Sequence, residues 1–429
     1  MNRLLALALL LPAASLADQR QVIDVGSPDF RPLPVALAPF RAEGEAKGAA
    51  AEAAEVLKGD LLLTGLFDLI DPKSFLADPG EGLTAAAIRF PRWADVGAEG
   101  LVKALVRKAR DGWSAELHLF EVRAAREVLF RVYAERTPRL LAHRAADDIV
   151  QYYTQEPGIF RTRIAVVRKS KGGVRELVLF DADGGNPEVV HRETTPVLLP
   201  AWKPDGRDLL FTGFAGGRPE LWLLRLADRT MRRFQGLGDL ASGGVFSPDG
   251  RRIAFTASEN GNSDIWVMNV DGSGPVRLTR DPATDTSPTW SPDGKRIAFV
   301  STRAGNPHLY VMNSDGSEQR RLTFQGTYNQ TPRWSPRGDL IAFTARDERK
   351  VFDVFTVSAQ TGKIARVTQD QGWTNEEPSW APNGRLLVFT SDRGGRAQLV
   401  VSTPGGDRQK IVTNDAGELE TPAWGPLPK

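Results

Sequence analysis

The residue types that most often build metal or nucleophilic sites are scarce in this chain. There is no cysteine, and the four histidines lie far apart, at His118, His143, His191 and His308. The absence of thiols excludes disulfides, thiolate metal sites and cysteine nucleophiles. Because the histidines lack the spacing of metal ligands, the sequence predicts no metal and no cofactor.

Aspartates recur at one position of a repeated turn, as in residues 290–294, Trp-Ser-Pro-Asp-Gly. A ring of carboxylates could bind a cation, but the turn itself explains these residues. Proline presets φ at the second turn position, and serine and glycine suit the first and fourth. Arg337 and Asn383 replace the aspartate in two repeats. We therefore assign these aspartates to turns and expect no catalytic residue among them.

The turn belongs to a unit that repeats through the C-terminal two-thirds of the chain. Its aromatic residue recurs at spacings of 44, 44, 44, 46 and 44 residues, at Trp202, Phe246, Trp290, Trp334, Trp380 and Trp424. A period in the forties indicates a propeller or a helical array. Short β-branched and aromatic runs inside each unit favour strands, and four short strands make a propeller blade.

The two ends of the repeat complete each other. The first unit lacks its inner strand, whereas the last unit stops after that strand. We therefore expect the strand near residues 421–424 to join residues 163–190, which leaves no open sheet edge. The sequence predicts a mainly β protein with a six-bladed β-propeller over residues 159–429, closed by the C-terminal strand.

Residues 18–158 do not repeat and are expected to form a small N-terminal α+β domain. The predicted strands cover residues 33–40, 100–107, 113–122 and 128–134, and the predicted helices cover residues 46–64 and 138–153. The second helix carries apolar residues at amphipathic spacing. Pro157 and Gly158 mark the junction with the propeller.

Residues 1–17 are predicted to be a cleavable signal peptide. Arg3 precedes an apolar run of eight residues, and Ser15 and Ala17 stand at positions −3 and −1 of a cut before Asp18. Eight apolar residues cannot span a bilayer, which takes about 20. The net charge is only +2, with both signs well mixed, and gives no reason to expect nucleic-acid or membrane binding.

Several segments outside the repeat resemble the TolB family of the periplasmic Tol–Pal system. They are residues 22–26 with 34–40, 60–67, 93–102, and 142–149 with 158–164. The resemblance implies a non-enzymatic periplasmic protein of a Gram-negative bacterium. It implies binding to the peptidoglycan-associated lipoprotein Pal at one mouth of the propeller and to inner-membrane TolA through the mature N-terminus. It also implies support of outer-membrane integrity and of constriction during division. We expect a monomer.

The loops that enter the inner strands vary while the blades repeat, as expected of a binding face on a scaffold. The resemblance points to Pal-binding residues in these loops: Leu240, Thr286, Ser287, Asn329, Thr331, Asn375, Glu376, Glu377 and Glu420. Leu240 departs from a polar position of the family pattern, and Ser287 departs from an acidic one. For TolA, the resemblance points to Asp18, Gln19, Val22, Ile23, Asp24 and Val25.

Three other classes of protein compete with this interpretation. Propellers with this motif cap prolyl-oligopeptidase-type hydrolases, but the chain has no Gly-x-Ser-x-Gly motif. A periplasmic carbohydrate-binding or lyase-type propeller would cluster histidines at the channel mouth, which this sequence does not do, although Tyr328 and Trp373 could stack on a sugar. A periplasmic scaffold with an unassigned partner is the third alternative.

Overall fold

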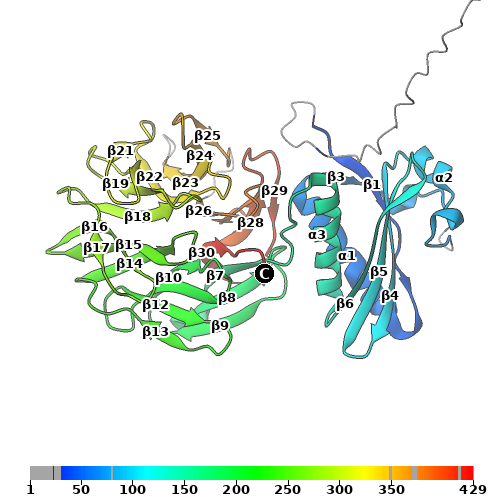
Figure 1. Ribbon diagram of the computed structural model, residues 1–429, viewed down its shortest axis with the longest axis horizontal. Helices are drawn as coiled ribbons and strands as arrows, with labels where there is room; N and C mark the ends of the chain where they lie inside the picture. The colour runs from blue at the N-terminus through cyan, green and yellow to red at the C-terminus, as the bar shows by residue number, and fades with distance from the viewer. Residues whose placement is uncertain are drawn as a thin grey trace, which may run out of the picture.

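A computed structural model describes Ile23 and residues 30–78, 81–346, 350–369, 374–413 and 417–428. It confirms the predicted fold class, a six-bladed β-propeller preceded by an α+β domain. The two bodies stand side by side, and helices of the α+β domain lie between its sheet and the propeller (Figure 1). Within the described residues, no helix has the length and apolar character needed to cross a membrane.

The α+β domain is built on one mixed sheet with strand order β3-β1-β4-β5-β6, and β2 pairs with β4. The strands are β1 (Leu33–Leu37), β2 (Arg41–Ala42), β3 (Phe67–Leu69), β4 (Gly100–Ala109), β5 (Gly112–Glu121) and β6 (Arg126–Glu135). Strand β1 lies between β3 and β4 and runs parallel to both, because the connections from β1 to β3 and from β3 to β4 are crossovers that contain helices. The four predicted strands are confirmed, whereas β2 and β3 were not predicted.

Two long helices, α1 (Lys47–Thr64) and α3 (Pro138–Thr154), confirm the predicted ones. Helix α1 ends at Gly65, whose φ of 71° suits glycine. Helix α3 begins at Thr137, whose side chain accepts a hydrogen bond from the Leu140 amide. The shorter helices are α2 (Phe90–Asp95), η1 (Gly44–Ala46), η2 (Pro72–Ser74), η3 (Ala85–Ala87) and η4 (Lys171–Gly173).

The propeller consists of six four-stranded antiparallel sheets, and the sixth places β30 beside β7. Blade 1 is β10 (Val197–Trp202), β11 (Asp208–Gly213), β12 (Glu220–Arg225) and β13 (Met231–Arg233). Blade 2 is β14 (Leu240–Phe246), β15 (Arg252–Glu259), β16 (Asn262–Asn269) and β17 (Val276–Arg277). Blade 3 is β18 (Asp285–Trp290), β19 (Arg296–Ser301), β20 (His308–Asn313) and β21 (Arg320–Arg321).

The remaining blades follow the same plan. Blade 4 is β22 (Tyr328–Trp334), β23 (Leu340–Arg346), β24 (Phe352–Ser358) and β25 (Ile364–Arg366). Blade 5 is β26 (Asn375–Trp380), β27 (Leu387–Ser391), β28 (Gln398–Ser402) and β29 (Gln409–Ile411). Blade 6 is β30 (Glu418–Trp424), β7 (Arg163–Lys169), β8 (Arg175–Asp181) and β9 (Glu188–Glu193).

The repeated tryptophans connect neighbouring blades. The indole nitrogens of Trp202, Trp290 and Trp380 donate to carbonyls on the inner strand of the preceding blade, at 2.9, 3.3 and 2.9 Å. A buried indole needs such an acceptor for its N–H. The repeated aspartate serves its own turn, since Asp293 accepts from the Lys295 amide at 3.1 Å. The turn assignment made from the sequence therefore agrees with the hydrogen bonds.

One hydrophobic core runs across the boundary between the two bodies. It combines Leu57, Ile149 and Tyr153 of the α+β domain with Phe180 and Trp424 of blade 6, all buried. Burial of this much apolar surface holds the domains together by the hydrophobic effect. The α+β domain therefore packs against blades 5 and 6 of the propeller.

Candidate functional site

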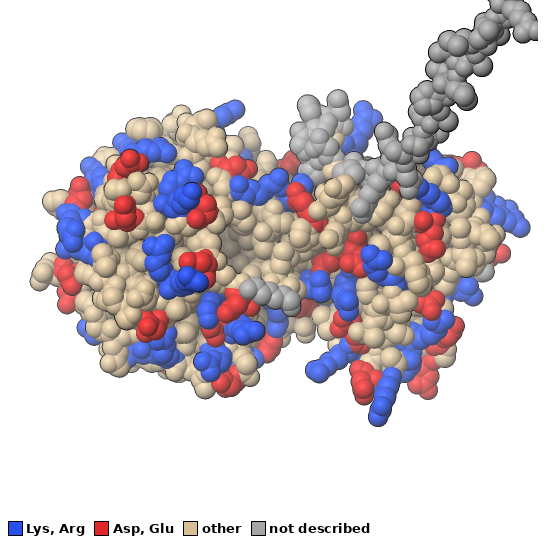
Figure 2. Space-filling view, in the orientation of Figure 1, with Lys and Arg blue, Asp and Glu red and all other residues tan. Residues whose placement is uncertain are grey.

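The propeller has two unlike faces, defined by the direction of the inner strands β10, β14, β18, β22, β26 and β30. These strands contact one another around the propeller axis. We call the face where they begin the rim face and the face where they end, with the Pro-Asp-Gly turns, the base face. Basic and acidic side chains are intermixed over the side of the molecule seen in Figure 2.

Every inner strand is interrupted by a β-bulge, and each bulge has one residue with positive φ. These residues, which we call the bulge ring, are Leu199, Gly243, Ser287, Thr331, Glu377 and Thr421, with φ of 53, 60, 56, 49, 59 and 48°. Positive φ in a residue other than glycine costs on the order of 1–3 kcal/mol. Three of the predicted Pal-binding residues, Ser287, Thr331 and Glu377, thus have strained backbone at the channel.

Neighbouring blades hold this strained backbone in place. Three bulge amides donate to a threonine hydroxyl on the preceding blade: Gly243 to Thr212 at 3.0 Å, Ser287 to Thr256 at 3.1 Å and Glu377 to Thr344 at 2.9 Å. A buried amide without an acceptor would cost about 1–3 kcal/mol. The rim backbone is therefore fixed before any partner arrives.

Most of the predicted Pal-binding residues are half-buried on the rim side of the inner strands. Leu240 begins β14 beside a cavity of about 250 Å³. Thr286 precedes the bulge of β18, and the Thr331 hydroxyl donates to the Thr344 hydroxyl at 2.9 Å. The structure therefore brings these side chains to one face, although they come from different blades.

The two predicted asparagines are buried supports of the rim loops. Asn329 is 1% exposed, and its amide nitrogen donates to the Thr323 hydroxyl and the Gln325 carbonyl, both at 3.1 Å. Asn375 is fully buried and accepts a hydrogen bond from Arg393 at 2.8 Å. In the free protein, these two side chains contact the protein itself and can act on a partner only through their loops.

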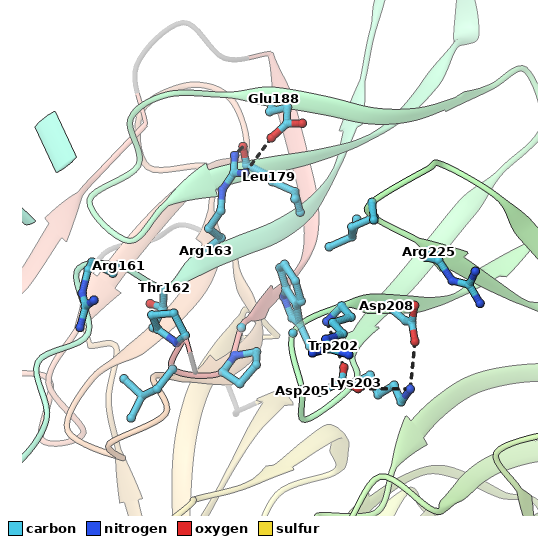
Figure 3. Close-up of a pocket in the computed structure, with 18 of the residues that line it drawn as sticks. Arg161, Thr162, Arg163, Leu179, Glu188, Trp202, Lys203, Asp205, Asp208 and Arg225 are labelled. Atoms are coloured by element: carbon cyan, nitrogen blue, oxygen red, sulfur yellow. Dashed lines mark hydrogen bonds and ion pairs between the residues drawn. The ribbon is translucent and has the colours of Figure 1, made fainter. Parts of the chain in front are cut away.

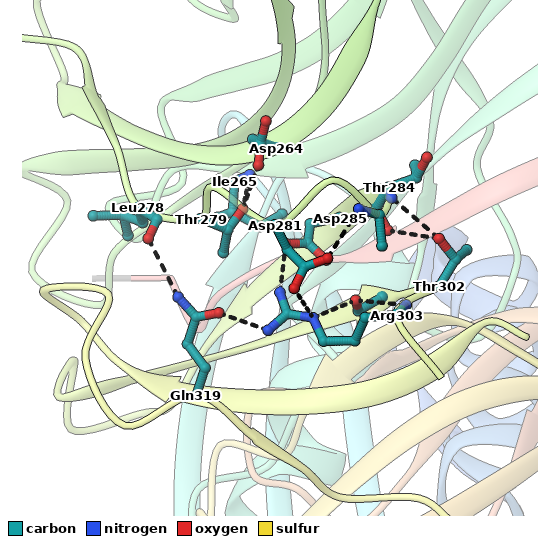
Figure 4. Close-up of polar contacts among 12 residues, drawn as sticks. Asp264, Ile265, Leu278, Thr279, Asp281, Thr284, Asp285, Thr302, Arg303 and Gln319 are labelled. Atoms are coloured by element: carbon teal, nitrogen blue, oxygen red, sulfur yellow. Dashed lines mark hydrogen bonds and ion pairs between the residues drawn. The ribbon is translucent and has the colours of Figure 1, made fainter. Parts of the chain in front are cut away.

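Blade 3 shows how such a support is built (Figure 4). Asp285, at the start of β18, accepts a hydrogen bond from Arg303 at 2.7 Å. The same guanidinium donates to Gln319 at 2.8 Å and to the Ser301 hydroxyl at 2.8 Å. Blade 5 repeats the arrangement with Asn375 in place of the aspartate. Sequence reasoning missed the pattern, although the aligned Asp and Asn at the strand starts were its signal.

Three glutamates, Glu376, Glu377 and Glu420, give the rim of blades 5 and 6 an acidic character. Burial raises the pKa of Glu377 to about 7 despite the hydrogen bond from the Thr421 amide, and the charges of Glu376 and Glu420 add to the rise. Burial also raises the pKa of Glu376. Glu420 pairs with Lys169. Because their ionised forms are poorly solvated, Glu376 and Glu377 are well suited to bind a basic group or a hydroxyl donor.

The base face carries an unpredicted cluster that joins the two domains, which we call the latch. Arg139 of α3 donates to Asp181 at 2.8 Å and to Asp183, both in blade 6. His143 Nδ1 lies 2.7 Å from Asp60 Oδ2 of α1, and its Nε2 lies 3.6 Å from Asp181 Oδ2. Burial opposes the charge on His143, but the hydrogen bond with Asp60 and the nearby carboxylate of Asp181 raise its pKa. Burial likewise raises the pKa of Asp60, so the two side chains share a proton-holding contact inside the latch.

The latch includes three side chains of the types that bind metal ions. His143, Asp181 and Asp183 each place one possible ligand atom within 4.8 Å of the others. The sequence analysis predicted no metal because the histidines are far apart in the chain. Arg139 already supplies a cation to both aspartates. The arrangement is thus explained as an interdomain ion-pair network. Its members are far apart in the sequence, so the sequence alone does not show that they are in contact.

A cavity of about 1010 Å³ opens on the base face between blades 1 and 6 (Figure 3). Its walls include Arg163, which donates to Glu188 at 2.7 Å, and Lys203, which donates to Asp208 at 3.0 Å. Trp202 and Pro426 supply apolar surface. Because acidic and basic wall residues pair with each other, the geometry favours a structural role for these charges.

The predicted TolA-binding segment is described only at Ile23. Its amide donates to the Tyr153 carbonyl at the end of α3 at 2.8 Å, and its side chain packs on the interdomain core. Asp18, Gln19, Val22, Asp24 and Val25 lie outside the described residues. Trp373, one of the two aromatic residues considered for sugar stacking, also lies outside them.

Together, these features define a six-bladed β-propeller protein with an accessory N-terminal α+β domain. A family model described as "TolB beta propeller domain" matches residues 150–428, and one described as "TolB amino-terminal domain" matches residues 21–128. The chain belongs to the TolB family of Tol–Pal system proteins. Its relatives are named as components of that system and not for a catalysed reaction.

Individual relatives agree with this assignment. The Tol-Pal system protein TolB of Anaeromyxobacter dehalogenans (strain 2CP-1) is 61% identical over 426 residues, covering 99% of this chain and 98% of that protein. TolB of Myxococcus xanthus is 48% identical over 222 residues, about half of each chain. The crystal structure of TolB from Acinetobacter baumannii has a TM-score of 0.83 and 28% identity, and the match covers 92% of this chain and 97% of that one.

Proposed function

We propose that this Tol–Pal component is a non-enzymatic periplasmic protein that binds Pal through the rim face. The observation that carries the proposal is the convergence of variable loops from all six blades on the rim face, while the α+β domain covers part of the base face. Loops held by a rigid scaffold are the usual carriers of binding residues. A preorganised loop loses little conformational entropy when a partner binds.

The rim supplies contacts of different kinds around the channel. Glu376, Glu377 and Glu420 offer acceptors for basic or hydroxyl groups, Leu240 offers apolar surface, and Thr286 offers a hydroxyl. Ser287 and Thr331 present the strained backbone of the bulge ring, and Asn329 and Asn375 keep their loops in position. The half-buried acids are the groups whose loss should weaken binding most, because an interfacial charge that is desolvated and paired is costly to disrupt.

We further propose that the mature N-terminus, from Asp18 to Val25, binds TolA. The hydrogen bond from Ile23 to the end of α3 supports a docked state of this segment on the protein body. Release toward TolA requires that the docked state be only a few kcal/mol more stable than the released one. Deletion of residues 18–30 should preserve folding and Pal binding and abolish TolA binding. Retained TolA binding contradicts this assignment.

The cellular role proposed here follows from both contacts. A monomer that is exported, cleaved before Asp18 and located in the periplasm would link Pal to TolA and support outer-membrane integrity and constriction during division. The division into residues 18–158 and 159–429 belongs to the same proposal. Mass spectrometry of the exported protein checks the cleavage site, and a mature form that begins elsewhere contradicts it.

Calorimetric titration of the mature protein with the soluble domain of the same organism's Pal tests the rim assignment. We expect saturable one-to-one binding that the double change Glu376→Ala and Glu377→Ala weakens at least tenfold. Arg207→Ala, which removes an exposed side chain at the base cavity, is the matched control and should leave the affinity unchanged. Absence of binding at tens of micromolar contradicts the proposal, and binding of glycans instead would favour a carbohydrate-binding propeller.

A further inference from the structure

The rim of blade 4 carries a group of aromatic and arginine side chains, two of them exposed, that has no part in the acidic contacts described above. Phe324, in the loop before β22, is 71% exposed, the highest fraction among the large hydrophobic side chains that the structure describes. Tyr328, at the start of β22, is 39% exposed. With Arg321, Arg346 and Phe352 they form what we call the arginine–aromatic patch. Exposure of large aromatic side chains at one place commonly marks an interaction surface.

The strand register lines up three members of this patch. Tyr328 pairs with Arg346 across β22 and β23, and Arg346 pairs with Phe352 across β23 and β24. The rings of Tyr328 and Phe352 meet edge to face with centroids 5.8 Å apart. The Arg346 guanidinium lies 5.7 Å from the Phe352 centroid. A row of Tyr, Arg and Phe therefore crosses the rim end of blade 4.

Phe324 is held in its exposed position by its own loop. The Arg321 guanidinium lies 4.9 Å from the Phe324 centroid and donates through Nε to the Thr323 carbonyl at 2.7 Å. The Thr323 hydroxyl in turn accepts from the Leu309 amide at 2.9 Å. This loop is therefore ordered although its aromatic side chain faces solvent. Binding of a partner there would cost little conformational entropy.

We infer that the arginine–aromatic patch is the apolar anchor of the Pal interface and sets the orientation of Pal on the rim. The inference rests on the proposed function and deepens it. Aromatic and arginine residues are the side chains most enriched among residues that dominate protein interfaces. The patch lies on blades 3 and 4, next to Asn329 and Thr331, which places it on the same face as the predicted contacts.

The charges of the rim indicate which side of the partner meets each blade. Arginines accompany the aromatic rings of the patch, whereas Glu376, Glu377 and Glu420 lie on blades 5 and 6. Complementary potentials favour one docking orientation over its reverse. The surface of Pal that covers the patch should therefore be apolar with acidic neighbours, and the part that reaches blades 5 and 6 should be basic or rich in hydroxyls.

The inference is tested by titrating the soluble domain of Pal against two single variants, Phe324→Ser and Tyr328→Ser. We expect at least a tenfold loss of affinity for Phe324→Ser and a smaller loss for Tyr328→Ser. Phe324→Tyr keeps the ring and should bind within threefold of the wild type. Val276→Ser is the matched control, because Val276 is 55% exposed on the outer strand β17 and away from the rim loops. Unchanged melting temperatures show that folding is preserved.

The outcomes separate this inference from the proposed function. If the wild type binds and Glu376→Ala with Glu377→Ala weakens binding, but Phe324→Ser binds like the wild type, the anchor is wrong and the proposed function stands. If Val276→Ser weakens binding as much as Phe324→Ser, the patch has no special role and the inference is overturned. If the wild type does not bind Pal, both proposals fail. Self-association that Phe324→Ser abolishes would assign the patch to a second copy of the chain and overturn the inference.

Discussion

The rim and base faces of the propeller are built from the same repeating blade, but they differ in how their polar and charged groups are used. On the rim face, the inner strands are interrupted by bulges with positive φ, and burial raises the pKa of two glutamates, Glu376 and Glu377. On the base face, regular turns satisfy their own polar groups, and the charged latch and an apolar core fix the α+β domain. The rim thus keeps strained and poorly solvated groups that a partner can use, whereas the base uses its charges internally.

The largest expected effect on stability comes from breaking the latch. Arg139→Met removes the guanidinium shared by Asp181 and Asp183, and leaves Asp181 with His143 at 3.6 Å and Arg163 at 3.8 Å. Removing one partner from a buried ion pair costs about 3–5 kcal/mol. We expect a loss of about 3 kcal/mol in the free energy of unfolding, measured by urea denaturation, while Pal affinity stays within twofold. A large loss of Pal affinity would show that the two faces are not independent.

The next effect tests whether the bulge ring is strained. Ser287 has φ of 56°, where a β-branched side chain fits poorly. Ser287→Val should lower the free energy of unfolding by about 2 kcal/mol, whereas Ser287→Gly should leave it unchanged or raise it slightly. Thermal melting of the pair measures the difference. Equal melting temperatures for the two variants would mean that this backbone carries no strain.

A third prediction concerns pH and Glu377. A carboxyl group with a raised pKa in the folded state contributes stability below its ordinary pKa of 4.5 and loses that contribution as pH rises through about 7. Glu377→Gln imitates the protonated group, so the variant should melt like the wild type near pH 4 and a few degrees higher at pH 8. A constant difference between the two proteins across this pH range contradicts the burial argument.

The smallest effect is expected at an exposed pair on the base face. Arg337 and Glu156 lie 3.5 Å apart with side chains 45% and 32% exposed. Surface ion pairs contribute about 0–1 kcal/mol. Arg337→Ala should therefore change the melting temperature by about one degree or less. A change as large as that of Arg139→Met would show that this exposed pair contributes as much to stability as the buried latch, and would contradict the argument from exposure.

The repeat made the fold class predictable from the sequence, but contacts between residues far apart in the chain could not be predicted. Trp and Pro-Asp-Gly recur at a nearly fixed spacing, and this repeated local pattern can be recognised in one sequence. The latch joins Asp60, His143 and Asp181, which are distant in sequence, so no local pattern pairs them. Asn329 and Asn375 were recognised as rim residues, but their burial depends on loops whose path the sequence does not specify.

The bulge ring was missed for a different reason. Proline follows five of its six members, and a residue before proline normally adopts extended backbone. The local rule therefore predicts the wrong conformation at Ser287, Thr331 and Glu377, because contacts between blades override it. The recurrence of these prolines at the blade spacing is the signal from which the ring could have been found.

The most direct test of the division of roles between the faces is amide hydrogen exchange of the mature protein with and without the soluble domain of Pal. We predict slower exchange in residues 240–243, 284–288, 324–331, 375–378 and 418–421, and unchanged exchange in the base turns at residues 203–208 and 292–295. Protection of the base turns with no change on the rim face would contradict the account.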